Sequence, residues 1–136
     1  MSPLKNILVA LILMTGAAAA DEKFAEKRVV AEVKDGVQRV EMTGGEYYFD
    51  PNVVVVKVNV PVELKVRKEA GITPHNIVLK APEAGINIDE SLSGDPKVVT
   101  FTPTKSGKYE FECTKKLPFV KSHKERGMHG VLEVVE

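Results

Sequence analysis

The sequence predicts an all-β fold, a Greek-key β-sandwich or barrel, and three observations support this prediction. Runs of β-branched and aromatic residues recur along the chain, for example at residues 53–60 and 131–135. Turn residues recur between these runs about every 8–12 residues, which is typical of β-sandwiches. No long stretch repeats apolar residues with a helical period. We therefore expect about six to eight strands in two packed sheets.

The first half of the chain contains the clearest strand and turn signals. Residues 28–42 hold five valines in two β-rich runs, and Asp35–Gly36 between them is a hairpin turn signal. Gly44–Gly45 is expected to break the chain before the aromatic residues of 46–50. Residues 63–67 alternate polar and apolar, as in a strand with one wet face.

The second half continues the same pattern. Short strands are expected at residues 75–79, 98–102 and 108–112, before the final run at 131–135. Between the first two lies a loop rich in proline and glycine, in which we expect a helical turn within residues 83–92.

Composition indicates one ordinary globular domain. Apolar residues make up 43% and charged residues 28% of the 136 positions, and the formal net charge is zero. This balance gives no reason to expect a nucleic acid or a membrane surface as partner.

Residues 1–20 are typical of a cleaved secretory signal peptide. Lys5 supplies a positive start, residues 7–14 form a short apolar run, and Ala17–Ala20 offers a cleavage site. A membrane-spanning helix would need about 20 apolar residues, so we expect no transmembrane segment. The prediction is an exported, periplasmic protein with one domain over residues 21–136.

A single cysteine is unusual in an exported chain. Structural cysteines of secreted proteins come in pairs, as disulfides. Cys113 has no partner in the sequence, so it must be buried or metal-bound to escape oxidation. The alternation of the preceding strand places its thiol on the same face as Tyr109 and Phe111.

Four residues form the ligand set of a mononuclear blue-copper site: His75, Cys113, His123 and Met128. Such sites combine two imidazoles and a thiolate with a weak axial thioether. Taken singly, Cys113 is as well explained as a buried structural cysteine, and His75 as a solvated loop residue. Met128, which follows Gly127 after a charged loop, is poorly explained as core.

The order of these residues resembles the cupredoxin family, that is, plastocyanin- and pseudoazurin-like proteins. The resemblance rests on Pro74-His75-Asn76-Ile77-Val78, on Gly107-Lys108-Tyr109-x-Phe111-x-Cys113, and on His123-x4-Met128-x-Gly130-x-Leu132. It extends from about residue 37 to residue 136.

This resemblance implies a copper-binding type 1 electron-transfer protein that is not an enzyme. His75, Cys113 and His123 would be equatorial ligands and Met128 the axial ligand, with Asn76 tying the two ligand segments together. A redox protein, such as a c-type cytochrome or a reductase or oxidase, would be the partner, and a monomer is expected.

Two features depart from the family pattern. Nine residues separate Cys113 from His123, a longer gap than in plastocyanin-like members. His129 directly follows Met128 and is an alternative ligand, as in red-copper relatives such as nitrosocyanin. In that case Glu46 or Glu63 is the carboxylate candidate.

The long loop before His123 supplies a second hypothesis, a docking surface for an acidic redox partner. Basic side chains surround an apolar patch there, and ordinary solvated lysines are the competing interpretation. The residues concerned are Lys115, Lys116, Leu117, Phe119, Lys121 and Lys124.

Three other functions remain open from the sequence. A periplasmic copper-trafficking or storage protein with this fold would be expected to carry Met- or His-rich tracts, which are missing here. A red-copper oxidoreductase would need an open metal position, and a purely structural sandwich needs no ligand at all. A Cys–His nucleophilic enzyme is disfavoured because no orienting third residue is apparent.

Overall fold

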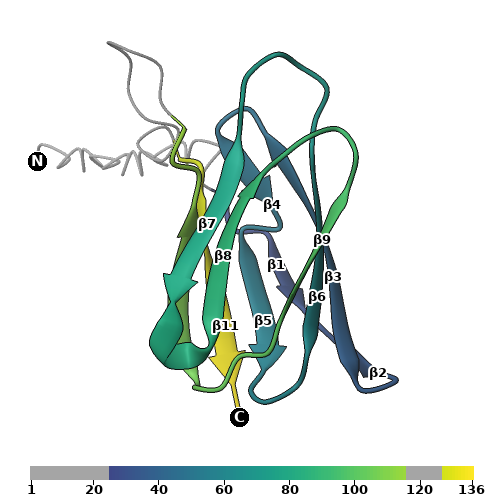
Figure 1. The fold of residues 1–136 in the computed structure, drawn as a ribbon, viewed down its shortest axis with the longest axis vertical. Helices are drawn as coiled ribbons and strands as arrows, with labels where there is room; N and C mark the ends of the chain where they lie inside the picture. Colours follow the sequence, from purple (N-terminus) through teal and green to yellow (C-terminus); the bar gives the residue numbers. More distant parts are fainter. Residues whose placement is uncertain (1–24, 116–126) are drawn as a thin grey trace, which may run out of the picture.

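The predicted all-β sandwich is confirmed by a computed structural model, which describes residues 25–115 and 127–136 (Figure 1). One sheet has the strand order β1-β5-β11-β10-β7-β8, and the other has β2-β3-β6-β9, with β4 paired to β3. The strands are β1 (Arg28–Val30), β2 (Val33–Lys34), β3 (Val37–Gly45), β4 (Tyr48–Asp50), β5 (Val53–Lys57), β6 (Val62–Lys68), β7 (Asn76–Ala81), β8 (Ile86–Ser91), β9 (Lys97–Phe101), β10 (Gly107–Glu112) and β11 (His129–Val135).

Parallel pairs connect distant parts of the chain. Strand β5 lies between β1 and β11 and is parallel to both. Strand β3 is parallel to β6 in the other sheet. The sandwich is therefore built by strands that cross between sheets and not by a simple succession of hairpins.

The hairpin expected at Asp35–Gly36 is confirmed. These two residues join β2 to β3 with φ values of 53° and 75°, the left-handed values that a two-residue hairpin turn requires.

Two local predictions were wrong. Gly44–Gly45 does not break the chain, because both residues lie within β3: Gly44 pairs with Phe49 of β4 and Lys68 of β6, and Gly45 pairs with Tyr48 of β4. The helical turn expected within residues 83–92 is limited to a short 3₁₀ helix, η2 (Pro82–Ala84), and β8 follows it directly. The described chain accordingly has more strands than were expected.

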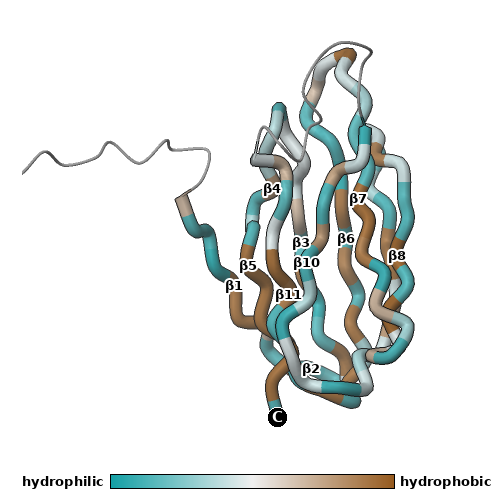
Figure 2. Tube along the Cα trace, turned by 90° about the vertical axis from the view of Figure 1, so that its left-hand side faces the viewer, coloured by the Kyte–Doolittle hydropathy of each residue, from teal (hydrophilic) through white to brown (hydrophobic). Residues whose placement is uncertain are grey.

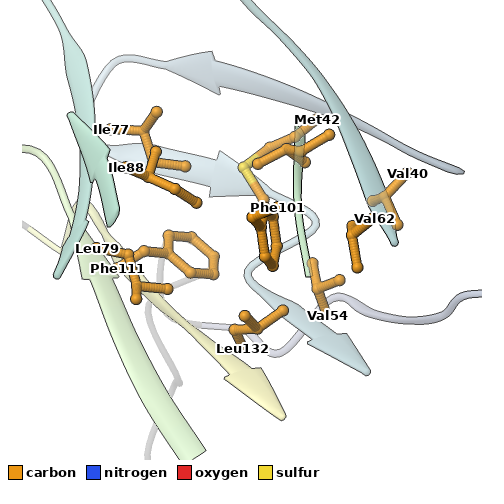
Figure 3. A pocket seen from close by; sticks show the side chains of 11 residues that line it. Val40, Met42, Val54, Val62, Ile77, Leu79, Ile88, Phe101, Phe111 and Leu132 are labelled. Atoms are coloured by element: carbon orange, nitrogen blue, oxygen red, sulfur yellow. The ribbon is translucent and has the colours of Figure 1, made fainter. Parts of the chain in front are cut away.

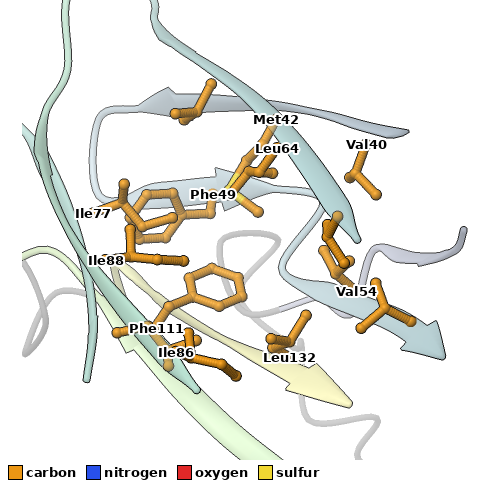
Figure 4. Close-up of a cluster of buried hydrophobic side chains, with 14 of the residues drawn as sticks. Val40, Met42, Phe49, Val54, Leu64, Ile77, Ile86, Ile88, Phe111 and Leu132 are labelled. Carbon is orange, nitrogen blue, oxygen red and sulfur yellow. The ribbon is translucent and has the colours of Figure 1, made fainter. Parts of the chain in front are cut away.

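Alternating side chains from both sheets form the apolar core. Figure 2 shows polar and apolar positions alternating along the strands. At the centre, the rings of Phe49 and Phe111 meet edge to face at 5.2 Å (Figure 4). A small apolar cavity lies beside Phe111 and is also lined by Val40, Met42 and Leu132 (Figure 3).

Tyr109 closes the turn before β10. Its hydroxyl donates to the Lys105 carbonyl at 2.8 Å, four residues upstream, while its ring packs against the core. This bond fixes the entry into the strand that leads to Cys113.

The predicted signal peptide lies outside the described residues. Within the described part of the chain, no helix combines the length and apolar character needed to cross a bilayer.

Candidate metal centre

Three of the four predicted ligand residues lie at one end of the sandwich. His75 immediately precedes β7, Cys113 immediately follows β10, and Met128 immediately precedes β11. Strand β10 is antiparallel to both β7 and β11, so these strand ends meet at the upper end in Figure 1. All three side chains are buried, with exposures of 3%, 0% and 0% respectively.

The segment carrying His75 is held by hydrogen bonds on both sides. The Leu92 amide donates to the His75 carbonyl at 2.9 Å. The Lys68 ammonium donates to the carbonyls of Gly71 and Thr73 at 2.7 and 3.2 Å, within the loop before His75. The loop that leads to His75 is therefore fixed in position by hydrogen bonds.

Cys113 is enclosed between β7 and β11. Its amide donates to the Met128 carbonyl at 3.0 Å, which extends the β10–β11 ladder by one pair. Burial raises the pKa of the Cys113 thiol, while backbone hydrogen bonds from Asn76 and Lys115 act in the opposite direction. Burial thus favours the neutral thiol, and the two amides supply stabilisation for a thiolate.

Asn76 joins the two ligand segments. Its amide nitrogen donates to the Thr114 hydroxyl at 2.8 Å, and its amide oxygen accepts from the Thr114 backbone N–H, also at 2.8 Å. This reciprocal pair links the residue after His75 to the residue after Cys113 across 38 positions of sequence.

Met128 points into the sandwich and His129 points out of it. Alternation along β11 buries Gly130, Leu132 and Val134 on the inner face together with Met128. His129 instead lies on the outer face, opposite Glu112 of the neighbouring strand β10, and is only half-buried. The arrangement favours Met128 over His129 as a partner for His75 and Cys113.

The two glutamates considered for a red-copper site do not join the buried cluster. Glu46 is exposed and accepts a hydrogen bond from the Thr73 hydroxyl at 3.1 Å. Glu63 pairs with Arg39 at 3.0 Å at the start of β6, the end of that strand far from the site. Within residues 25–115 and 127–136, no three His, Cys, Asp or Glu side chains gather as a metal-binding group.

His123, the fourth predicted ligand, lies outside the described residues. So do five of the predicted docking residues, Lys116, Leu117, Phe119, Lys121 and Lys124. Of that surface the structure describes Lys115, which is half-buried. Both hypotheses therefore stay predictions.

The donor set fits copper. A buried thiol, imidazole and thioether are ligands that suit copper and soft metals, and Ca²⁺ or Mg²⁺ would need oxygen ligands instead. The two amide donors toward the Cys113 sulfur are the outer-shell support that a metal thiolate requires.

Sequence reasoning missed two residues that line this end. Leu92 and Gly44 both lie beside Met128 in the interior. A glycine within a strand pattern signals close approach of other groups, so Gly44 carried a readable signal. Leu92 sits in a polar loop and carried none.

Comparison with known proteins places the chain in a family. The model of the cupredoxin-like domain matches residues 6–132. A search of curated proteins finds no match. Among solved structures, the metal-binding domain of the Cu(I)-exporting P-type ATPase CopA of Streptococcus pneumoniae is 22% identical, covers 82% of this chain and 99% of its own, and has a TM-score of 0.61.

Two further structures are similar. A copper-binding protein in its apo form is 25% identical over 79% of this chain and 96% of its own, with a TM-score of 0.58. Auracyanin A, a "blue" copper protein from Chloroflexus aurantiacus, is 23% identical over 74% of this chain and 100% of its own, with a TM-score of 0.57. With most of its length matched by the family model, this chain belongs to the cupredoxin-like domain family.

Proposed function

We propose that this protein binds one copper ion and transfers single electrons between redox partners. The observation that carries the proposal is the burial of His75, Cys113 and Met128 together at one end of the sandwich. His123, outside the described residues, is the second imidazole of the proposed set. The bound ion would supply the one-electron Cu(I)/Cu(II) couple.

In this proposal the fold keeps the metal-binding residues in fixed positions. The backbones of His75 and Cys113 are tied by hydrogen bonds to Leu92 and Met128, and Asn76 links the two segments through Thr114. A pre-organised donor set of this kind changes little between oxidation states, which favours rapid electron transfer.

The proposal also includes the location, oligomeric state and domain organisation of the protein. We infer an exported, periplasmic, monomeric protein with one cupredoxin domain over residues 21–136 and no enzymatic activity. The names of the similar structures, a "blue" copper protein and a copper-binding protein, support a copper role.

The decisive experiment is the visible and EPR spectrum of residues 21–136 loaded with Cu(II). An intense visible charge-transfer band with a narrow hyperfine splitting is expected for a thiolate in a trigonal site. Cys113→Ser should abolish the band, whereas His129→Ala, on the outer face, should leave it unchanged. A Cys113→Ser protein that keeps the band would contradict the thiolate assignment.

Met128→Leu tests the axial position separately. We expect this variant to retain copper and to show a raised reduction potential, because a weak thioether bond to Cu(II) is lost. Complete loss of copper would mean that Met128 is not a weak axial ligand.

Copper trafficking is the second candidate, supported by the likeness to the metal-binding domain of a Cu(I) exporter. The rates of Cu(I) release to a chelator and of electron exchange separate the two functions. Fast electron exchange with slow release supports the carrier, and the reverse supports trafficking.

A further inference from the structure

Gly44 lies where three side chains crowd against the backbone of β3. A Cβ atom built on it would be 2.9 Å from Leu92 Cδ1, 3.4 Å from Met128 Cε and 3.8 Å from Phe49 Cε1. The first distance is closer than van der Waals contact, so the end of the Leu92 side chain would have to move. The second distance is at the short end of ordinary contact, so a methyl group at position 44 would rest directly against the Met128 methyl.

Backbone conformation does not explain this glycine. Gly44 is paired on both sides of β3, with Phe49 and with Lys68, and it is not among the residues with positive φ. Glycine in a strand interior weakens the strand, and it often marks close approach of another group. Lack of space beside Leu92 and Met128 is the remaining reason for glycine here.

The two nearest atoms belong to Leu92 and Met128, whose backbones are hydrogen-bonded to the proposed ligands His75 and Cys113. Leu92 donates its amide hydrogen to the His75 carbonyl, and Met128 accepts one from Cys113. A side chain at position 44 would therefore displace groups beside the proposed site and not groups at the surface.

We propose that Gly44 is a positioning residue for Met128. Because position 44 carries no side chain, the end of the Met128 side chain can occupy its observed position beside β3. The inference rests on the proposed role of Met128 as axial ligand. Axial thioether bonds are weak and long, so a small displacement of the side chain changes the balance between the two oxidation states.

The test is Gly44→Ala in residues 21–136, with the reduction potential and the charge-transfer spectrum as readouts. We expect the ratio of Cu(I) to Cu(II) affinity to change by about threefold to tenfold, where tenfold is about 59 mV for a one-electron couple. A fall in potential means that the sulfur is pressed nearer the metal, and a rise means that it is displaced. No change in either readout would overturn the inference.

Gly94→Ala is the matched control. Nothing lies within 4 Å of a Cβ at this position, and its φ is also not positive. The same glycine-to-alanine exchange here should leave the potential and spectrum as in the unaltered protein.

A second background shows whether the effect passes through Met128. In Met128→Leu protein, Gly44→Ala should no longer shift the potential; a shift of undiminished size would exclude Met128 as the route. If Met128→Leu alone shifts nothing, the axial assignment fails. If it shifts the potential and Gly44→Ala does not, only the role of Gly44 fails.

Folding of the variant is checked on the copper-free protein by thermal unfolding. If Gly44→Ala does not fold, the double variant Gly44→Ala/Leu92→Val removes the 2.9 Å contact and keeps the one with Met128. The same shift is expected of this variant relative to Leu92→Val, and its absence would overturn the inference.

Discussion

Asn76 links the segments that carry His75 and Cys113 by two hydrogen bonds to Thr114. Asn76→Ala removes both hydrogen bonds to Thr114, and we expect the unfolding free energy to fall by about 2 kcal/mol. Urea unfolding of the copper-free protein measures this loss. Asn87→Ala, at an exposed position of β8, is the control and should change stability by less than about 0.5 kcal/mol.

Tyr48 makes stability sensitive to alkaline pH. Burial, followed by the hydrogen bond to Glu69 and the nearby charge of Asp50, raises its pKa to about 12. Between about pH 10 and this value the unfolded chain has released the phenol proton and the folded chain retains it. The contribution of Tyr48 is therefore complete below about pH 10 and is lost as the pH rises towards 12.

Tyr48→Phe isolates this effect. We expect the stability difference between the unaltered protein and Tyr48→Phe to shrink as the pH rises from about 9 to about 12. Unfolding by urea at a series of pH values checks it. A difference that stays constant across this range would show that the phenol does not titrate differently in the two states.

At the scale of single residues, the sequence predicted which side chains share the inner face near Cys113. Phe111 and Cys113 are both buried, as strand alternation required. The partnership of Asn76 with Thr114 was beyond a single sequence, because hydrogen bonds across 38 residues leave no local pattern. Ligand chemistry together with the family resemblance linked His75, Cys113 and Met128, and the role of each as a ligand remains a prediction.

At the scale of elements, a buried glutamine connects β3 to the turn between β5 and β6. Gln38 is fully buried, donates to the carbonyls of Lys57 and Val60 at 3.0 and 3.1 Å, and accepts from the Lys57 amide at 2.7 Å. Alternation places Gln38 on the inner face with Val40 and Met42. The sequence does not show its hydrogen-bond partners, because they lie 19 and 22 positions away.

Gln38→Leu should destabilise the protein by about 2–4 kcal/mol, since three backbone groups lose their partner while the volume is retained. The free energy of unfolding, measured with a denaturant, gives the size of this loss. Arg39→Ala, one position away on the exposed face, removes only the ion pair with Glu63 and should cost less than about 1 kcal/mol. Equal losses for both variants would contradict the role assigned to Gln38.

The elements also show where pattern reading fails. Asp35–Gly36 was predictable because a two-residue turn is fixed by local geometry. Strand β8 was missed although Ile86 and Ile88 alternate with polar residues, because prolines and glycines on both sides of it are typical of a loop. Gly44–Gly45 was misread because tertiary packing, not local preference, keeps these residues within β3.

At the scale of the whole molecule, copper should act as a stabilising ligand. A metal that binds only the folded state at about 1,000 times its dissociation constant adds about 4 kcal/mol. We expect removal of copper with a chelator to lower the melting temperature of residues 21–136, and to leave that of Cys113→Ser unchanged. Calorimetry with and without chelator checks this, and an equal shift in both proteins would locate the copper elsewhere.

The position of β5 between the first and last strands has a consequence for the order of folding. Val54 pairs with Val29 on one side and with Leu132 on the other, so this sheet is complete only when both ends of the chain have docked. Joining such distant segments costs loop-closure entropy before any contact repays it, which slows folding. Met128 directly precedes β11, so we expect its thioether to arrive with the last strand. The ability to hold a metal would then be among the last properties that the folding chain acquires.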